Sequence, residues 1–147
     1  MQNNRRRKKF LRRHSLSLAA LGIVILWIVL YRHSDQNTHI GSFFGNAIAD
    51  WTGVLVTILA TKFLYEKGSR ESRQPKGILP SMVMEFLHEH SLTIFLVLSG
   101  IGWVVMFKGM NPNGKWGQVV GNIVSEWTQI LGLVLLTKRL MEVGSKE

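Results

Sequence analysis

The chain aligns with itself without a gap when it is shifted by 76 residues. From Phe10 to Glu71 the alignment gives 23 identities in 62 positions, against about five expected by chance for such a composition. Gly45-Asn46 matches Gly121-Asn122, for example. An internal repeat constrains a fold strongly because each copy builds the same structural unit. The sequence therefore predicts a tandem duplication of one unit.

Each repeat contains two apolar segments. Leu16 to Tyr31 and Leu92 to Phe107 carry no charge, whereas Ile40 to Thr61 and Trp116 to Thr137 each carry a single acid. A membrane-spanning helix needs roughly 20 apolar residues, with about 17 as the lower end. Four such segments leave too little polar surface for a soluble fold, so we expect four spans. They cover about 15–31, 41–65, 91–107 and 117–141.

The predicted fold is an all-α integral membrane protein built from two helical hairpins. Because each repeat has an even number of spans, both copies insert in the same orientation, which requires a pseudo-two-fold axis along the membrane normal. A four-helix transmembrane bundle is the simplest arrangement. The predicted regions are a basic N-terminus (1–9), repeat one (10–71), a linker with the start of an interfacial helix (72–85) and repeat two (86–147).

Basic residues are distributed unevenly between the predicted loops. Residues 1–15 hold seven Lys and Arg, 62–90 hold five, and the chain from 138 holds three, against three in the two other loops. The excess places both termini and the central loop in the cytoplasm. We expect the basic N-terminus to contact anionic lipid headgroups rather than nucleic acid. No small-residue cleavage site follows the first apolar segment, so we expect it to be retained as a span.

Polar residues gather on one face of the second span in each repeat. At about 100° per residue, Asn46, Asp50, Gly53, Thr57 and Thr61 fall within an arc of about 100°, as do Asn122, Glu126, Gln129, Leu133 and Thr137. An acid at mid-membrane costs roughly 2.5–3.5 kcal/mol on insertion scales. The acids therefore predict either a structural contact that fixes helix register or an ion or proton site. The candidate site residues are Asp50, Glu126, Asn46, Asn122, Thr57 and Gln129.

Small residues recur every four positions in the same two spans. The set comprises Gly41, Gly45, Ala49, Gly53, Gly117, Gly121 and Ser125. This spacing lets helix backbones approach closely. It predicts helix packing, either within the chain or between copies.

Other polar residues have ordinary structural interpretations. Ser15 and Ser91 occupy expected N-cap positions, and His14 and His90 are expected in interfacial contacts. Glu66 is expected to form a helical i,i+4 pair with Arg70. We expect a solvent-exposed helix face, rather than a metal site, at Glu85, His88 and Glu89.

Catalytic chemistry has little support in the sequence. There is no phosphate-binding loop, no nucleophile–base arrangement and no cysteine, so no disulfide or cysteine-linked lipid is possible. We expect neither enzyme activity nor a cofactor or metal.

Short phrases in both repeats resemble a family of small bacterial four-span membrane proteins of unknown function. These phrases are Phe-Leu-x-x-His-Ser-Leu-Ser/Thr at the start of each half, and Glu126-Trp127-Thr128-Gln129 followed by Leu135-Leu136-Thr137 and Gly144-Ser145-Lys146-Glu147. The family's Trp-Ser-Glu order is Ser125-Glu126-Trp127 here. The resemblance implies a bacterial source and a multi-pass protein of the inner membrane, and it carries no known activity.

Two functions follow as expectations. The first is a non-enzymatic membrane protein that acts through helix packing, as a homo-oligomer or as an accessory subunit of a larger membrane complex. The second is a small oligomeric cation or proton channel or transporter that uses the paired acids.

Overall fold

The computed structural model describes residues 2–67, 82–137 and 140, and this part of the chain is all-helical. Its helices are α1 (Gln2–His33), α2 (His39–Phe63), α3 (Met82–Glu89), α4 (Ser91–Lys108) and α5 (Lys115–Leu136). Four of them contain a segment long and apolar enough to cross a membrane: Phe10–His33 of α1, and all of α2, α4 and α5. Large apolar side chains along these helices, such as Leu98 and Val105, are exposed. The four segments are therefore candidate membrane spans by length and composition.

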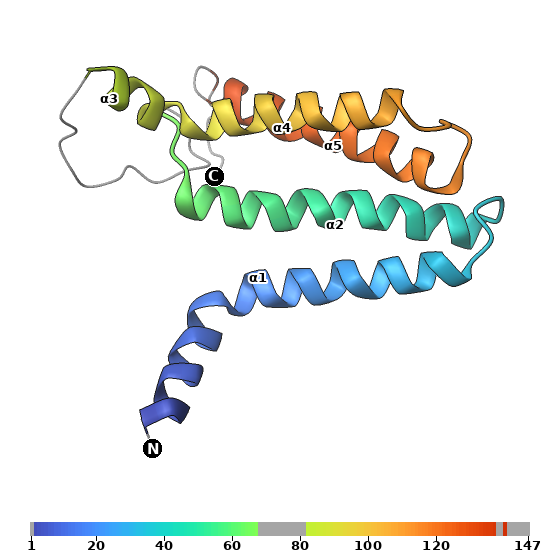
Figure 1. The fold of residues 1–147 in the computed structure, drawn as a ribbon, viewed down its shortest axis with the longest axis horizontal. Coiled ribbons are helices and arrows are strands. Elements are labelled where there is room, and N and C mark those ends of the chain that lie inside the picture. Colours follow the sequence, from blue (N-terminus) through green and yellow to red (C-terminus); the bar gives the residue numbers. More distant parts are fainter. Residues whose placement is uncertain (1, 68–81, 138–139, 141–147) are drawn as a thin grey trace.

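Three of the four helices keep close to their predicted bounds, but α1 begins much earlier. It starts at Gln2 rather than near residue 15, because the basic segment contains neither Gly nor Pro to end a helix. In Figure 1 the N-terminal turns of α1 lie at an angle to its apolar part. The predicted N-cap role of Ser15 is wrong, since Ser15 lies inside α1 and its hydroxyl donates to the Arg12 carbonyl. The predicted end of the fourth span, 137–141, falls largely outside the described residues.

Within each hairpin a short loop joins the two helices, and the two loops have matching geometry. In the first loop the Asp35 side chain accepts from the Asn37 N–H at 2.9 Å, and in the second the Asn111 side chain accepts from the Asn113 N–H at 3.0 Å. Such side-chain-to-backbone bonds are typical of Asp and Asn in turns. Residues 35 and 111 are equivalent in the repeat alignment. The duplicated sequence therefore builds the same turn twice.

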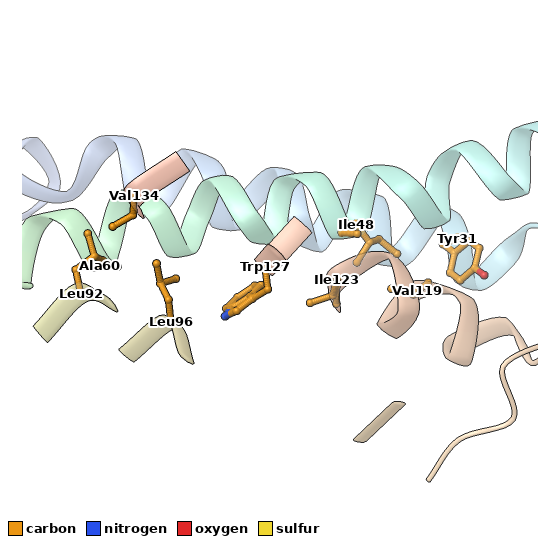
Figure 2. Close-up of a cluster of buried hydrophobic side chains, with 10 residues drawn as sticks. Tyr31, Ile48, Ala60, Leu92, Leu96, Val119, Ile123, Trp127 and Val134 are labelled. Atoms are coloured by element: carbon orange, nitrogen blue, oxygen red, sulfur yellow. The ribbon is translucent and has the colours of Figure 1, made fainter. Parts of the chain in front are cut away.

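Helices α2 and α5 pack against each other, with α1 against α2 and α4 against α5. Figure 1 shows these four helices running side by side. Figure 2 shows the buried apolar core extending along them, from Val134, Ala60 and Leu92 past Trp127 to Tyr31. The core thus joins side chains from both repeats, and α2 with α5 forms the most extensive contact between the hairpins.

Helix α3 presents its apolar side chains to the outside. Met82, Val83, Phe86 and Leu87 are all exposed. The sequence predicted an interfacial helix from 78 to 89, of which residues 78–81 lie outside the described part. An exposed apolar face on a short helix beside a membrane span suits the headgroup region.

Candidate functional site

Two asparagines predicted on the polar arc meet where α2 and α5 pack together. The Asn122 side-chain amide donates to the Asn46 side-chain oxygen over 2.5 Å. The two residues are equivalent in the repeat alignment, so this bond crosses from one repeat to the other. An asparagine side chain has two donor hydrogens and two acceptor lone pairs. The bond uses one donor hydrogen of Asn122 and one acceptor lone pair of Asn46. The remaining donors and acceptors of both side chains can bind other polar partners.

The two acids lie one helical turn further along, again beside each other. Asp50 and Glu126 lie close enough for their carboxylates to repel each other. Glu126 Oε1 also accepts from the Gln129 amide at 3.3 Å. Its other oxygen lies over Gly53, where a Cβ would be 3.4 Å away. Gly53 thus leaves room for the Glu126 carboxyl against α2, and the acids, Gln129 and Gly53 form one cluster.

The acids lie within the apolar length of the hairpins. The ring of Tyr31, near the end of α1, packs on Gly45 of α2. Asp50 is five residues further, which is about 7–8 Å along the helix axis. On the other hairpin, the Trp127 indole donates to Ser99 in the middle of α4 at 2.8 Å. Both acids therefore lie in the central part of the candidate spans α2 and α5.

The acid cluster differs in exposure between its two halves. Asp50 is exposed and Glu126 is half-buried. Asn46, Ser125 and Gln129 are exposed as well. A single copy of the chain therefore leaves part of its polar arc uncovered at mid-span.

Thr57 does not join this cluster. It lies seven residues beyond Asp50, or about 10 Å along α2. There it lines a separate small cavity of about 40 Å³ together with Leu133 and Val134. The sequence placed Thr57 correctly on the arc but not within reach of the acids.

A larger cavity of about 340 Å³ lies between the hairpins, toward the loop ends of the spans. The Tyr31 hydroxyl at its edge donates to the Lys115 carbonyl at 2.6 Å and ties α1 to α5. Asn46 and Asn122 line this cavity, one helical turn from the acids, and neither acid is part of its lining. Most of its lining consists of repeat-equivalent pairs: Tyr31 with Phe107, Ser42 with Gln118, Gly45 with Gly121, and Asn46 with Asn122.

The small residues have three different roles. Gly45 and Gly121 accommodate an aromatic ring within their own hairpins, because a Cβ would lie 3.1 Å from Tyr31 and 3.0 Å from Phe107. Ala49 is fully buried in the core. Gly53 lies at the contact between the hairpins, whereas Ser125 is exposed.

For Gly41 and Gly117 the nearest atoms to an added Cβ belong to a loop rather than to another helix. Each lies in the first turn of its helix against the preceding loop. A Cβ on Gly41 would overlap the Asp35 carbonyl oxygen, and one on Gly117 would overlap the Asn111 carbonyl oxygen. Both glycines are therefore needed for the close approach of these loops.

The sequence missed a buried carboxylate at the other end of the spans. Glu66 is fully buried, its Oε1 lies 2.6 Å from His90 Nδ1, and its Oε2 accepts from the Thr93 N–H at 3.0 Å. Thr93 is in the first turn of α4, where free backbone N–H groups favour an anion. Arg70, the predicted i,i+4 partner of Glu66, lies outside the described residues, and Glu66 itself lies beyond the end of α2 at Phe63. The retention of Glu66 as Glu142 and of His90 as His14 in the repeat was the available signal.

Backbone bonds reinforce this contact between the end of α2 and the start of α4. The Lys67 N–H donates to the Glu89 carbonyl, and the Leu92 N–H donates to the Tyr65 carbonyl. Lys67 and Glu89 also form an ion pair at 2.7 Å. The hydrogen bond to Glu89 raises the pKa of Lys67. Ser91, predicted as an N-cap, instead accepts from the Tyr65 N–H and so joins the two segments.

Across residues 2–67 and 82–137, no group of three or more His, Asp or Glu side chains is placed to hold a metal ion. The chain matches no protein-family model, no curated protein and no solved structure.

Proposed function

We propose that this chain is a non-enzymatic protein of the bacterial inner membrane that assembles with further copies of itself. The assembly surface in this proposal is the polar face of α2 and α5, which comprises Asn46, Asp50, Ser125, Glu126 and Gln129. One observation carries the proposal: Asp50 is exposed near the middle of a membrane span.

An exposed acid at this depth is unfavourable in lipid. Placing it in the bilayer core costs roughly 2.5–3.5 kcal/mol on insertion scales, and polar side chains in spans are expected to face protein or water. A second copy would place its own amides and carboxyls against this polar face, where the groups of the two copies can bond to each other. Polar bonds between spans contribute on average about 0.6 kcal/mol each, so several together offset the exposure of Asp50. A proton shared between neighbouring carboxyls would lower their repulsion.

The proposed architecture is a four-helix bundle with a pseudo-two-fold axis between α2 and α5, along the membrane normal. The bond between the equivalent residues Asn46 and Asn122 supports it. In this arrangement both termini are cytoplasmic, and the basic N-terminus contacts anionic headgroups. The same polar face would serve an accessory subunit if the partner were a different membrane protein.

Cross-linking tests the assembly surface. On this cysteine-free background, Ser125→Cys should give a cross-linked dimer in membranes treated with an oxidant. Leu26→Cys is the matched control, because Leu26 is also exposed at mid-span but lies on α1. Cross-linking through Leu26 alone, or a strictly monomeric protein in lipid nanodiscs, would contradict self-assembly through the polar face.

A second candidate is a cation or proton pathway through the same residues. The cavity of about 340 Å³ favours it, because Asn46 and Asn122 of its lining lie one helical turn from the acids. Oxygen-rich groups suit hard cations, and carboxyls suit proton relay.

Liposome flux measurements separate the two candidates. If the chain forms a pathway, the parent protein should show ion flux and the double variant Asp50→Asn with Glu126→Gln should show none. Cross-linking through Ser125→Cys should persist in the double variant. Unchanged flux in the double variant would refute the pathway, and no parent flux across several cations and pH values would leave assembly alone.

A further inference from the structure

An apolar groove of about 480 Å³ runs along α4 and α5. Its α4 side includes Leu96, Gly100 and Val104, and it ends at Lys108. Trp127 of α5 contributes to its wall. The one polar atom of the Trp127 ring donates to Ser99, so the indole offers hydrocarbon to the groove.

The groove lies on the side of α5 away from the acids. At about 100° per residue, Val124, Thr128 and Leu131 lie on the opposite side of the helix from Asn122 and Glu126, and all three line the groove. The groove is therefore independent of the proposed assembly surface.

The dimensions of the groove match one leaflet of a bilayer. From Leu96 to Lys108 the lining covers twelve residue steps, or about 18 Å of helix. Half of a hydrocarbon core is about 15 Å. A chain lying in the groove would therefore run from mid-membrane to the headgroup level, where Lys108 stands at the end of α4.

A glycine helps to open this groove. Gly100 of α4 is equivalent to Val24 of α1 in the repeat alignment, and Val24 is buried against its neighbours. A side chain at position 100 would meet Trp127, since a Cβ there would be 3.3 Å from the indole. The second repeat thus leaves space where the first repeat places a valine.

Charge complementarity selects the occupant. Lys108 is exposed, and the ion pairs among the described residues do not include it. A lysine ammonium is a common partner of phosphate. We propose that the groove binds one acyl chain of an anionic phospholipid, with the lipid phosphate on Lys108.

Native mass spectrometry with phosphatidylglycerol as the probe tests this site. Lys108→Gln should lower retention of phosphatidylglycerol about fivefold, because one basic residue near a membrane surface contributes about a factor of five to binding of anionic lipid. Arg32→Gln is the matched control: Arg32 is the repeat-equivalent cation at the end of α1 and is also exposed. It should leave retention unchanged.

A second pair of variants tests the apolar part. Val104→Trp fills the groove and should reduce retention of phosphatidylglycerol, whereas Leu98→Trp, on an exposed part of α4 outside the groove lining, should not. Equal retention of phosphatidylcholine and phosphatidylglycerol would overturn the proposal, as would equal effects of Lys108→Gln and Arg32→Gln. Cross-linking of Val104→Cys to a second copy would also overturn it, because a helix would then fill the groove.

Discussion

Replacing Gly117 with alanine should destabilise the protein although alanine is the better helix former. A Cβ at this position would overlap the Asn111 carbonyl oxygen and lie 2.9 Å from the carbonyl carbon. Ordinary contacts begin near 3.4 Å, so the loop before α5 has to move or the helix has to unwind. Overpacking of this kind costs typically 1–3 kcal/mol. At about 2–4 °C per kcal/mol for a chain of this size, the melting temperature should fall by roughly 2–12 °C.

The measurement is thermal unfolding in detergent, followed by size-exclusion chromatography of heated samples. Gly102→Ala is the control, because Gly102 is also helical but a Cβ there meets nothing within 4 Å. It should leave stability unchanged or raise it by up to about 1 kcal/mol, since glycine is the poorer helix former. Gly41→Ala should behave like Gly117→Ala because the repeat builds the same contact. A Gly117→Ala protein as stable as Gly102→Ala would refute the reasoning.

Two further outcomes are expected. Glu66→Ala should destabilise the protein by about 3–5 kcal/mol in the same thermal assay, because it removes one partner of a buried charged contact and leaves the Thr93 N–H without this acceptor. Glu89→Ala, which removes a partly exposed ion pair, should have a much smaller effect. Equal effects of the two variants would contradict the role assigned to burial. Single cysteines at Asn37 and Asn113 should react with a membrane-impermeant maleimide added from the periplasmic side, and labelling at position 72 instead would contradict the proposed topology.

The repeat and the four apolar segments could be read from the sequence because they depend on local order along the chain. Helix formation in a membrane is required for every spanning segment, since no water is present to satisfy the backbone. The positions of α2 and α4 therefore followed from composition alone. The polar arc followed equally directly, because residues three and four apart share one face of any helix.

The bounds of α1 and the position of Glu66 could not be predicted in the same way. The sequence pattern marks where a helix becomes apolar and not where it begins, so it predicts a first span from about residue 15 and a separate basic N-terminus. Glu66 lies beyond the end of α2 at Phe63 and belongs to no helix. Its burial depends on the start of α4, which is 25 residues further along the chain, and no local signal reports that contact.

What the sequence determined by itself was the duplication, the four spans and the identity of the polar face. What only the tertiary structure decided was which residues on that face meet. Asn122 bonds to Asn46 and Asp50 lies near Glu126, whereas Thr57 lies about 10 Å further along α2 than Asp50. The same distinction separates the glycines. Gly41 and Gly45 belong to the same four-residue spacing, but Gly41 contacts a loop carbonyl and Gly45 contacts an aromatic ring. Helical periodicity fixes the direction of a side chain, and only the packing of α2 on α5 fixes what lies opposite it.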